Sequence, residues 1–244
     1  MRPFPKPRNL EEARALQNEL RSRVELSGDP RAARLVAALD ASAKKNEGLF
    51  AVAVLWDRAQ NAPLAAASAH VPEEDLFPYV PGFLSFREAE AYLRALEQLP
   101  EPPEALLVDG QGIAHPRGLG IAAHLGVHTG LPAVGVAKRR LYGAPAGLLP
   151  EEGDAAVPLC GPREALGVAA EGCPGVQIGW VWRSRPRTNP LFVSPGHRSG
   201  MAEALDFARG FPRRTKLPEP LRLAHRLSGQ ARTRRVQGQL ALEF

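Results

Sequence analysis

Short apolar segments and amphipathic segments alternate along this chain, and their order restricts the fold more than any other feature of the sequence. The first three apolar runs, at 34–40, 50–56 and 64–70, follow one another directly. The turn-like residues 57–63 join the second run to the third, which predicts a hairpin. Because strands joined by hairpins run antiparallel, we expect these three to form an antiparallel meander.

Helix signals separate the later strands. The pairs Asn9 with Glu12 and Ser85 with Glu88 each have the spacing of a capping box, which marks the start of a helix. Strands joined through helices and added to a meander give the element order of an RNase H-like α/β fold, a mixed sheet flanked by helices. The full pattern predicts helices over 10–26, 85–99, 117–128, 199–209 and 219–228, and later strands over 105–109, 133–137, 176–182 and 191–193.

The length of 244 residues suits a single domain with a well-buried core. We expect that domain to cover 1–228, with a Gly/Pro-rich loop or insertion at 143–175 and a basic tail at 229–244. The two cysteines, Cys160 and Cys173, lack the close spacing of a zinc site. We expect no disulfide between them in a reducing compartment and read both as incidental.

Charge and hydropathy narrow the class of protein. No apolar run is long enough to span a membrane, and the first residues lack the apolar segment of a signal peptide, so we expect a cytoplasmic protein. The stretch from Arg183 to Phe244 holds thirteen Lys and Arg against four Asp and Glu, a net charge of +9. Such a segment suits the phosphate backbone of a nucleic acid. The alternative is an ordinary solvated basic surface.

Three carboxylates are placed where a catalytic site would form. Asp40 ends the first predicted strand, Asp109 ends the fourth, and Glu88 lies in the first turn of the helix between the third and fourth strands. Ligands gather at the carboxyl ends of strands in α/β sheets, and clustered carboxylates need a cation such as Mg²⁺ to offset their repulsion. Taken singly, each acid has a structural alternative, as a helix cap or part of a turn.

Five segments of the chain are specific enough to compare with known families. They are PYVPGFLSFRE at 78–88, VDGQGIAHPR at 108–117, GVAKR at 135–139, WVWRS at 180–184 and NPLFVSPGHR at 189–198. These segments resemble the endonuclease V family, and the likeness runs from about residue 10 to 228. Gln111 departs from the family pattern, in which many members carry histidine.

The resemblance implies an RNase H-like fold and metal-dependent repair of DNA that contains deoxyinosine. The implied cut falls at the second phosphodiester bond 3′ to the lesion and leaves 3′-hydroxyl and 5′-phosphate ends, with Mg²⁺ as the cofactor and Mn²⁺ as a substitute. The residues that match the family's functional positions are the metal-binding acids Asp40, Glu88 and Asp109, the further active-site residues Lys138, His115 and His225, the DNA wedge Tyr79 with Pro78, Val80 and Pro81, and the lesion-pocket candidates Gly82, Leu84 and Gly110.

Other functions stay open from the sequence. A structure-selective RNase H-like nuclease acting on junctions or flaps would carry the same acids. An endoribonuclease acting on inosine-containing RNA would also share them, and a basic nucleic-acid-binding protein could hold them for structural reasons. We expect a monomer that binds damaged, inosine-containing DNA.

Overall fold

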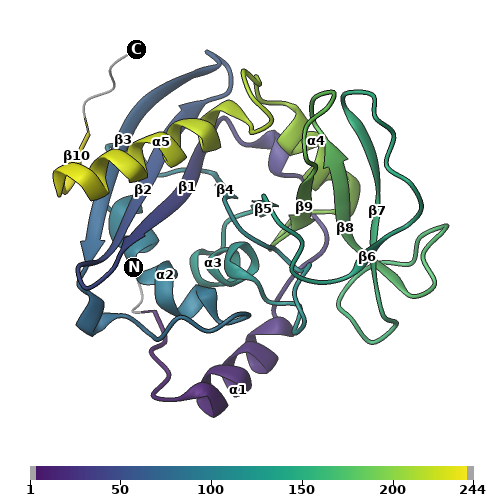
Figure 1. Cartoon of the computed structure of the whole chain (residues 1–244), viewed down its shortest axis with the longest axis horizontal. Coiled ribbons are helices and arrows are strands. Elements are labelled where there is room, and N and C mark those ends of the chain that lie inside the picture. The colour runs from purple at the N-terminus through teal and green to yellow at the C-terminus, as the bar shows by residue number, and fades with distance from the viewer. Residues whose placement is uncertain (1–3, 241–244) are drawn as a thin grey trace.

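The computed structural model describes residues 4–240 and contains a ten-stranded sheet with helices on both faces (Figure 1). The strands are β1 (Leu35–Lys44), β2 (Gly48–Asp57), β3 (Ala62–Val71), β4 (Ala105–Val108), β5 (Ala133–Ala137), β6 (Ala144–Pro145), β7 (Ala155–Gly161), β8 (Val176–Arg183), β9 (Leu191–Pro195) and β10 (Gly238–Gln239). The helices are α1 (Leu10–Arg21), α2 (Leu84–Leu96), α3 (Ile121–Thr129), α4 (Met201–Arg209) and α5 (Glu219–Arg234), with short 3-10 turns η1 (Pro30–Ala32) and η2 (Glu73–Asp75).

The strand order is β10-β3-β2-β1-β4-β5-β9-β8-β7-β6. Strands β1, β2 and β3 form the antiparallel meander that the sequence predicts. Strands β4 and β5 join β1 in parallel, and β9 then returns antiparallel to β5. The mixed sheet with helices on both sides confirms the predicted RNase H-like α/β fold.

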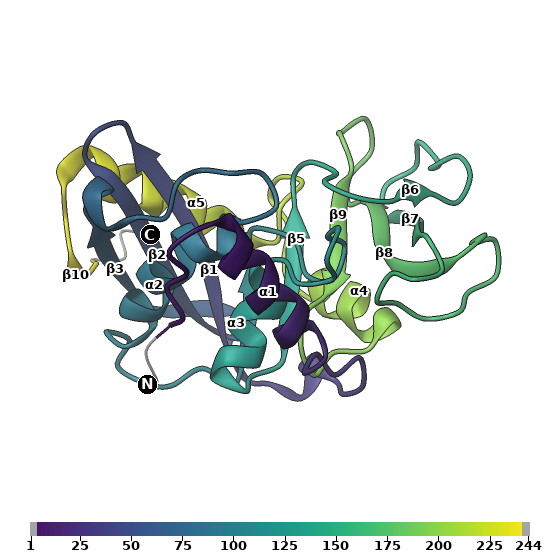
Figure 2. The same ribbon diagram turned by 90° about the horizontal axis from the view of Figure 1, so that it is seen from below.

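The two faces of the sheet pack against different helices, and β1 shows the division most clearly. Its side chains alternate, so Val36 and Ala38 pack in the core under α4 and α5, whereas Ala37 and Leu39 pack in the core under α2 and α3. Figure 2 shows α5 behind the meander and α2 in front of it. Every residue of β2 is buried between these layers.

The start of α2 differs from the prediction. Ser85 and Glu88 do not form a capping box, because the helix begins one residue before Ser85 and its cap, Phe83, makes no side-chain hydrogen bond. The hydroxyl of Ser85 instead contacts Nδ1 of His124 at 3.0 Å. Glu88 therefore lies in the second turn of the helix, not the first, and its carboxylate accepts a hydrogen bond from Tyr92 instead of forming the cap.

The Gly/Pro-rich stretch 143–175 is more ordered than the sequence suggests. It contains β7, which pairs antiparallel with β8 and so extends the sheet. The expectation that the cysteines are unpaired was wrong, because Cys160 and Cys173 form a disulfide with their Cα atoms 5.5 Å apart. The chain turns back after β7 and brings the two together, a proximity that their spacing in the sequence does not reveal.

Several element boundaries also differ from the prediction, most of all in the first and last helices. The first helix ends at Arg21, before the predicted residue 26. The last helix continues past residue 228 to Arg234, and residues 238–239 then pair with β3 at the edge of the sheet. Part of the expected tail is therefore structured, while its residues 241–244 lie outside the described part of the chain. Within residues 4–240, no helix is long and apolar enough to cross a membrane.

Candidate active site

Strand alternation places three charged side chains on one face of the sheet. Asp40 shares the face of Val36 and Ala38, which is the face covered by α4 and α5. By the same alternation, Asp109 directly follows β4 and Lys138 directly follows β5 on this face. Asp40 itself lies within β1, which continues to Lys44, so the prediction that it ends its strand was wrong.

The register of the parallel strands brings Asp40 and Asp109 side by side. Val108 pairs with Leu39, and the backbone N–H of Asp109 donates to the carbonyl of Leu39 at 2.9 Å. The next residue on each strand is an aspartate, so the two carboxylates meet where β4 ends. This geometry confirms that the first and fourth strands are neighbours.

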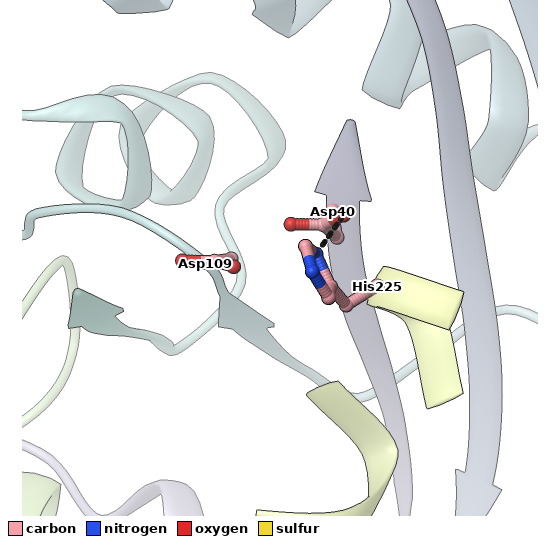
Figure 3. Close-up of side chains that lie close together, drawn as sticks. All are labelled: Asp40, Asp109 and His225. Carbon is pink, nitrogen blue, oxygen red and sulfur yellow. Dashed lines mark hydrogen bonds and ion pairs between the residues drawn. The ribbon is translucent and has the colours of Figure 1, made fainter. Parts of the chain in front are cut away.

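Helix α5 completes the group from above this face. Nδ1 of His225 lies 3.2 Å from Oδ2 of Asp40, and the buried hydroxyl of Ser228 donates to the same oxygen at 2.6 Å. Asp40, Asp109 and His225 each offer one ligand atom, and these atoms all lie within 4.8 Å of one another (Figure 3). Two carboxylates and an imidazole are donors that suit Mn²⁺, and the carboxylates suit Mg²⁺.

Lys138 supplies positive charge to this group. Its ammonium forms an ion pair with Oδ2 of Asp109 and lies 3.2 Å from Nδ1 of His225. The side chain is about a third exposed, so it can also face a phosphate that approaches from solvent. Lys138 thus lies where it can balance the acids or contact a bound nucleic acid.

Glu88 approaches the same acids from the opposite layer. It stands on α2 and accepts a hydrogen bond from the hydroxyl of Tyr92 at 3.2 Å. Burial, together with the negative charges of Asp40 and Asp109, raises the pKa of Glu88 to about 8. Burial and the neighbouring Asp40 likewise raise the pKa of Asp109 to about 7. The acids therefore repel one another, and a bound divalent cation would relieve this repulsion.

A cavity of about 130 Å³ is lined by residues that are close in sequence to two of the acids. Leu84 precedes Glu88 on α2, and Gln111 follows Asp109 after β4. The predicted pocket residues Gly82 and Leu84 line it. Gly110 does not line it, but lies so close to Ile121 of the wall that an added Cβ would meet Cγ2 of that side chain at 2.4 Å.

Three side chains meet at the backbone carbonyl of Gly82, in one wall of the cavity. It accepts hydrogen bonds from Nε2 of Gln17 at 3.0 Å and from Arg117 at 2.6 Å, and Nε2 of His115 lies 3.0 Å away. Gly82 has a φ of +80°, a conformation that favours glycine. His115 thus belongs to the cavity, where burial lowers its pKa to about 4, and its hydrogen bonds are not with the acids.

The loop at the mouth of the cavity carries an exposed aromatic ring. Tyr79 is 70% exposed, and Val80 and Pro81 line the cavity beside it. Pro78 lines a different cavity, which Phe77 and Phe86 also line. A protruding tyrosine on a short loop between prolines has the form expected of a wedge, because proline restricts the backbone around it.

The basic segment after Arg183 is only partly available to a partner. Arg183 bonds the carbonyls of Pro150 and Thr188, and Arg213 bonds the carbonyl of Arg209 and lies over the ring of Trp182. These two arginines make contacts within the protein, so their side chains are not free to bind a partner. Arg226, next to His225 on α5, is exposed.

Sequence reasoning missed two residues that contact the acids, because Ser228 donates to Asp40 and Tyr92 donates to Glu88. It named Gln111 only as a departure from the family pattern, and the structure places that residue in the cavity wall. A signal was present for the two missed residues, because Ser228 lies three residues after His225 and Tyr92 lies four after Glu88. Residues at these spacings share a helix face.

Comparison with known proteins gives consistent results. A family model for endonuclease V matches residues 18–226. The endonuclease V of Thermus thermophilus is 59% identical over 229 residues, which are 94% of this chain and 96% of that protein. The solved endonuclease V of Streptomyces avermitilis has a TM-score of 0.80 and 36% identity, over 95% of this chain and 97% of that one. The catalytic domain of human endonuclease V has a TM-score of 0.78 and 30% identity, over 95% and 98%.

Proposed function

Because this chain belongs to the endonuclease V family, we propose that it is a metal-dependent DNA repair endonuclease that cleaves at the second phosphodiester bond 3′ to deoxyinosine. Nuclease activity follows from the family. The cleavage position, the 3′-hydroxyl and 5′-phosphate ends and the use of Mg²⁺, with Mn²⁺ as a substitute, are part of the proposal. So are a monomeric state and a cytoplasmic location.

The observation that carries the proposal is the acid group, together with a cavity lined by the residues that precede Glu88 and follow Asp109. Asp40, Asp109 and His225 would hold the metal ion, and Glu88 would complete the site from α2. A bound divalent cation supplies an activated water and stabilises negative charge on the phosphate. Ser228 keeps Asp40 in place for that role.

Lys138 would act on the phosphate. It lies at the solvent side of the acids and can pair with a phosphate oxygen once a metal ion offsets the charge of Asp109.

The cavity would hold the damaged base after it leaves the helix. The cavity of about 130 Å³ would take the flat ring system of a purine. Enzymes that act at a base commonly turn it out of the stack into such a pocket. Tyr79 at its mouth would fill the space that the base leaves.

Cleavage assays on matched oligonucleotides test this proposal. We expect the protein with Mg²⁺ to cut DNA that contains one deoxyinosine and to leave the same sequence with deoxyadenosine intact. Mapping the product ends gives the bond that is cut. The same assay on inosine RNA and on a four-way junction measures the two competing activities. Preferential cutting of the junction without inosine would contradict the proposal.

Replacing the wedge tyrosine should affect duplex DNA most. We expect Tyr79→Ala to slow cleavage of inosine duplex by about tenfold or more, because opening a stacked step costs a few kcal/mol and the ring no longer offsets it. Single-stranded inosine DNA should be cut at nearly the wild-type rate. The measurement is the ratio of the two rates.

Leu148→Ala is the matched control, because Leu148 is 95% exposed on a different loop. This control should leave the ratio unchanged. If Tyr79→Ala slows both substrates equally, Tyr79 is not a wedge, and it would then act as part of the cavity wall.

A further inference from the structure

Tyr79 borders two hollows that share no other lining residue. One is the cavity described above, and the other is an open groove of about 500 Å³. The rest of the groove is lined by the end of β1, by the tip of the turn between β1 and β2, and by Glu73 and Arg87. The exposed tyrosine therefore lies between two separate hollows on the surface of the protein.

Contacts within the protein hold the turn between β1 and β2 in place. Gly48 follows the turn and packs so closely against β3 that an added Cβ would lie 2.1 Å from the carbonyl oxygen of Val71. The carbonyl of Glu47 lies 2.7 Å from Nε2 of His70, and its carboxylate accepts a hydrogen bond from Arg235 at 2.9 Å. This wall of the groove is therefore part of the packed fold.

Lys45, at the tip of the turn, carries a positive charge that no acid balances. It is exposed, and no carboxylate within residues 4–240 forms an ion pair with it. The neighbouring Lys44 pairs with Glu47 at 2.7 Å. Glu73 is the only acid among the described residues that line the groove, and both its oxygens accept hydrogen bonds from Arg87 at 2.9 Å. The groove thus presents the charge of Lys45 to solvent.

A groove with a free lysine beside an exposed aromatic ring suits the backbone of a nucleic-acid strand. Lysine binds phosphate as a point charge, and the release of counterions favours that contact. A duplex that is opened by an inserted ring has two strands to place. When a base of one strand occupies the cavity, the strand that was paired with it passes on the other side of the ring, where it needs a site of its own.

We propose that the groove binds the backbone of the complementary strand, which lies opposite the damaged base, and that Lys45 contacts one of its phosphates. This inference rests on the proposed function and adds a site for the second strand. A single-stranded substrate has nothing to place in the groove. Lys45 should therefore contribute to the binding of duplex DNA and not to the binding of a single strand.

Equilibrium binding without metal tests this contact and avoids cleavage. The probes are a duplex with one deoxyinosine, the same duplex with deoxyadenosine, and the inosine strand alone. We expect Lys45→Gln to weaken binding of the inosine duplex by about fivefold at physiological salt and to leave the single strand unchanged. The slope of log affinity against log salt concentration should become shallower by about 0.9 on the duplex, which corresponds to one lost phosphate contact.

Neutral methylphosphonate linkages, placed one at a time in the inosine duplex, identify the strand that Lys45 contacts. A linkage at the contacted phosphate should weaken binding by the wild type about as much as Lys45→Gln does. It should not weaken Lys45→Gln further, because the same contact is already lost. We expect this position in the complementary strand, and a position in the inosine strand would overturn the proposal.

Arg163→Gln is the matched control, because Arg163 is an exposed cation that forms no ion pair within the described chain. It follows β7, which lies on the far side of the sheet from β1 and β2 (Figure 1). This control should change neither the affinity nor the salt slope. An equal loss in Arg163→Gln would show that only net charge matters, and would overturn the contact.

The remaining outcomes separate this inference from the proposed function. Equal weakening of duplex and single strand by Lys45→Gln, or no weakening of either, would overturn the second-strand site alone. A wild type that binds the deoxyinosine and deoxyadenosine duplexes equally would instead overturn the proposed substrate. Thermal unfolding of Lys45→Gln and of the control checks that both variants keep the fold.

Discussion

Asp40→Asn and Asp109→Asn should each reduce cleavage of inosine DNA by orders of magnitude and leave binding of that DNA intact or stronger. The two carboxylates meet on one face of the sheet, where each supplies a ligand atom to the same group. Asparagine keeps the shape of the side chain but removes its charge. Metal affinity and activation of water should therefore fall together, while the repulsion between protein and phosphate decreases.

The measurement compares single-turnover cleavage with binding in the absence of metal. Asp206→Asn is the matched control, because Asp206 is an exposed acid on α4 that pairs with Arg31. It should cleave and bind like the wild type. Near-wild-type cleavage by both active-site variants would remove Asp40 and Asp109 from the catalytic group.

The sequence predicts this acid pair because the prediction depends only on local strand patterns. Once the 34–40 and 105–109 runs are identified as strands, alternation and the carboxyl-end rule place Asp40 and Asp109 together. The structure agrees, although β1 extends beyond Asp40. Apolar patterning thus located the centre of the site to within a few residues.

Contacts between segments that are distant in the chain could not be predicted from the sequence. Nothing in the spacing of Gln17, Gly82 and Arg117 shows that the three meet at one carbonyl. The disulfide between Cys160 and Cys173 depends in the same way on a turn of the chain that composition alone does not encode. Tertiary packing decides such contacts.

The capping-box error at α2 has a related cause. Ser85 has the capping-box spacing from Glu88, but in the packed structure its hydroxyl contacts His124 of α3. Glu88 is then directed to Tyr92 and the acid group. Tertiary contacts thus replaced the capping box that the local sequence predicts. Glu88, which does not cap the helix, is one of the candidate catalytic acids.

Glu88→Gln should stabilise the metal-free protein at pH 8 to 9 while it impairs cleavage. The folded-state pKa of Glu88 is raised from 4.5 to about 8, so the folded protein holds this proton more tightly than the unfolded chain does. Its contribution to stability is therefore present below about pH 4.5 and is lost as the pH rises through 8. Asp109, with its pKa raised to about 7, acts in the same direction.

We expect a gain on the order of 2 kcal/mol for Glu88→Gln above pH 8, which allows for the water that reaches a half-buried carboxyl. The gain should vanish near pH 4. The measurement is the free energy of unfolding from denaturant titrations between pH 4 and 9 in EDTA. Glu74→Gln, an exposed position on η2, is the control and should not change the pH profile.

The same repulsion predicts how Mg²⁺ or Mn²⁺ changes the stability of the protein. A cation bound among the acids offsets their repulsion, so it should stabilise the wild type more at pH 8 than at pH 5, where protons already neutralise part of the charge. Asp40→Asn should lose most of that stabilisation. A stabilisation by metal that does not vary with pH, or that persists in Asp40→Asn, would place the cation elsewhere on the protein. The acids would then repel one another without forming the metal site.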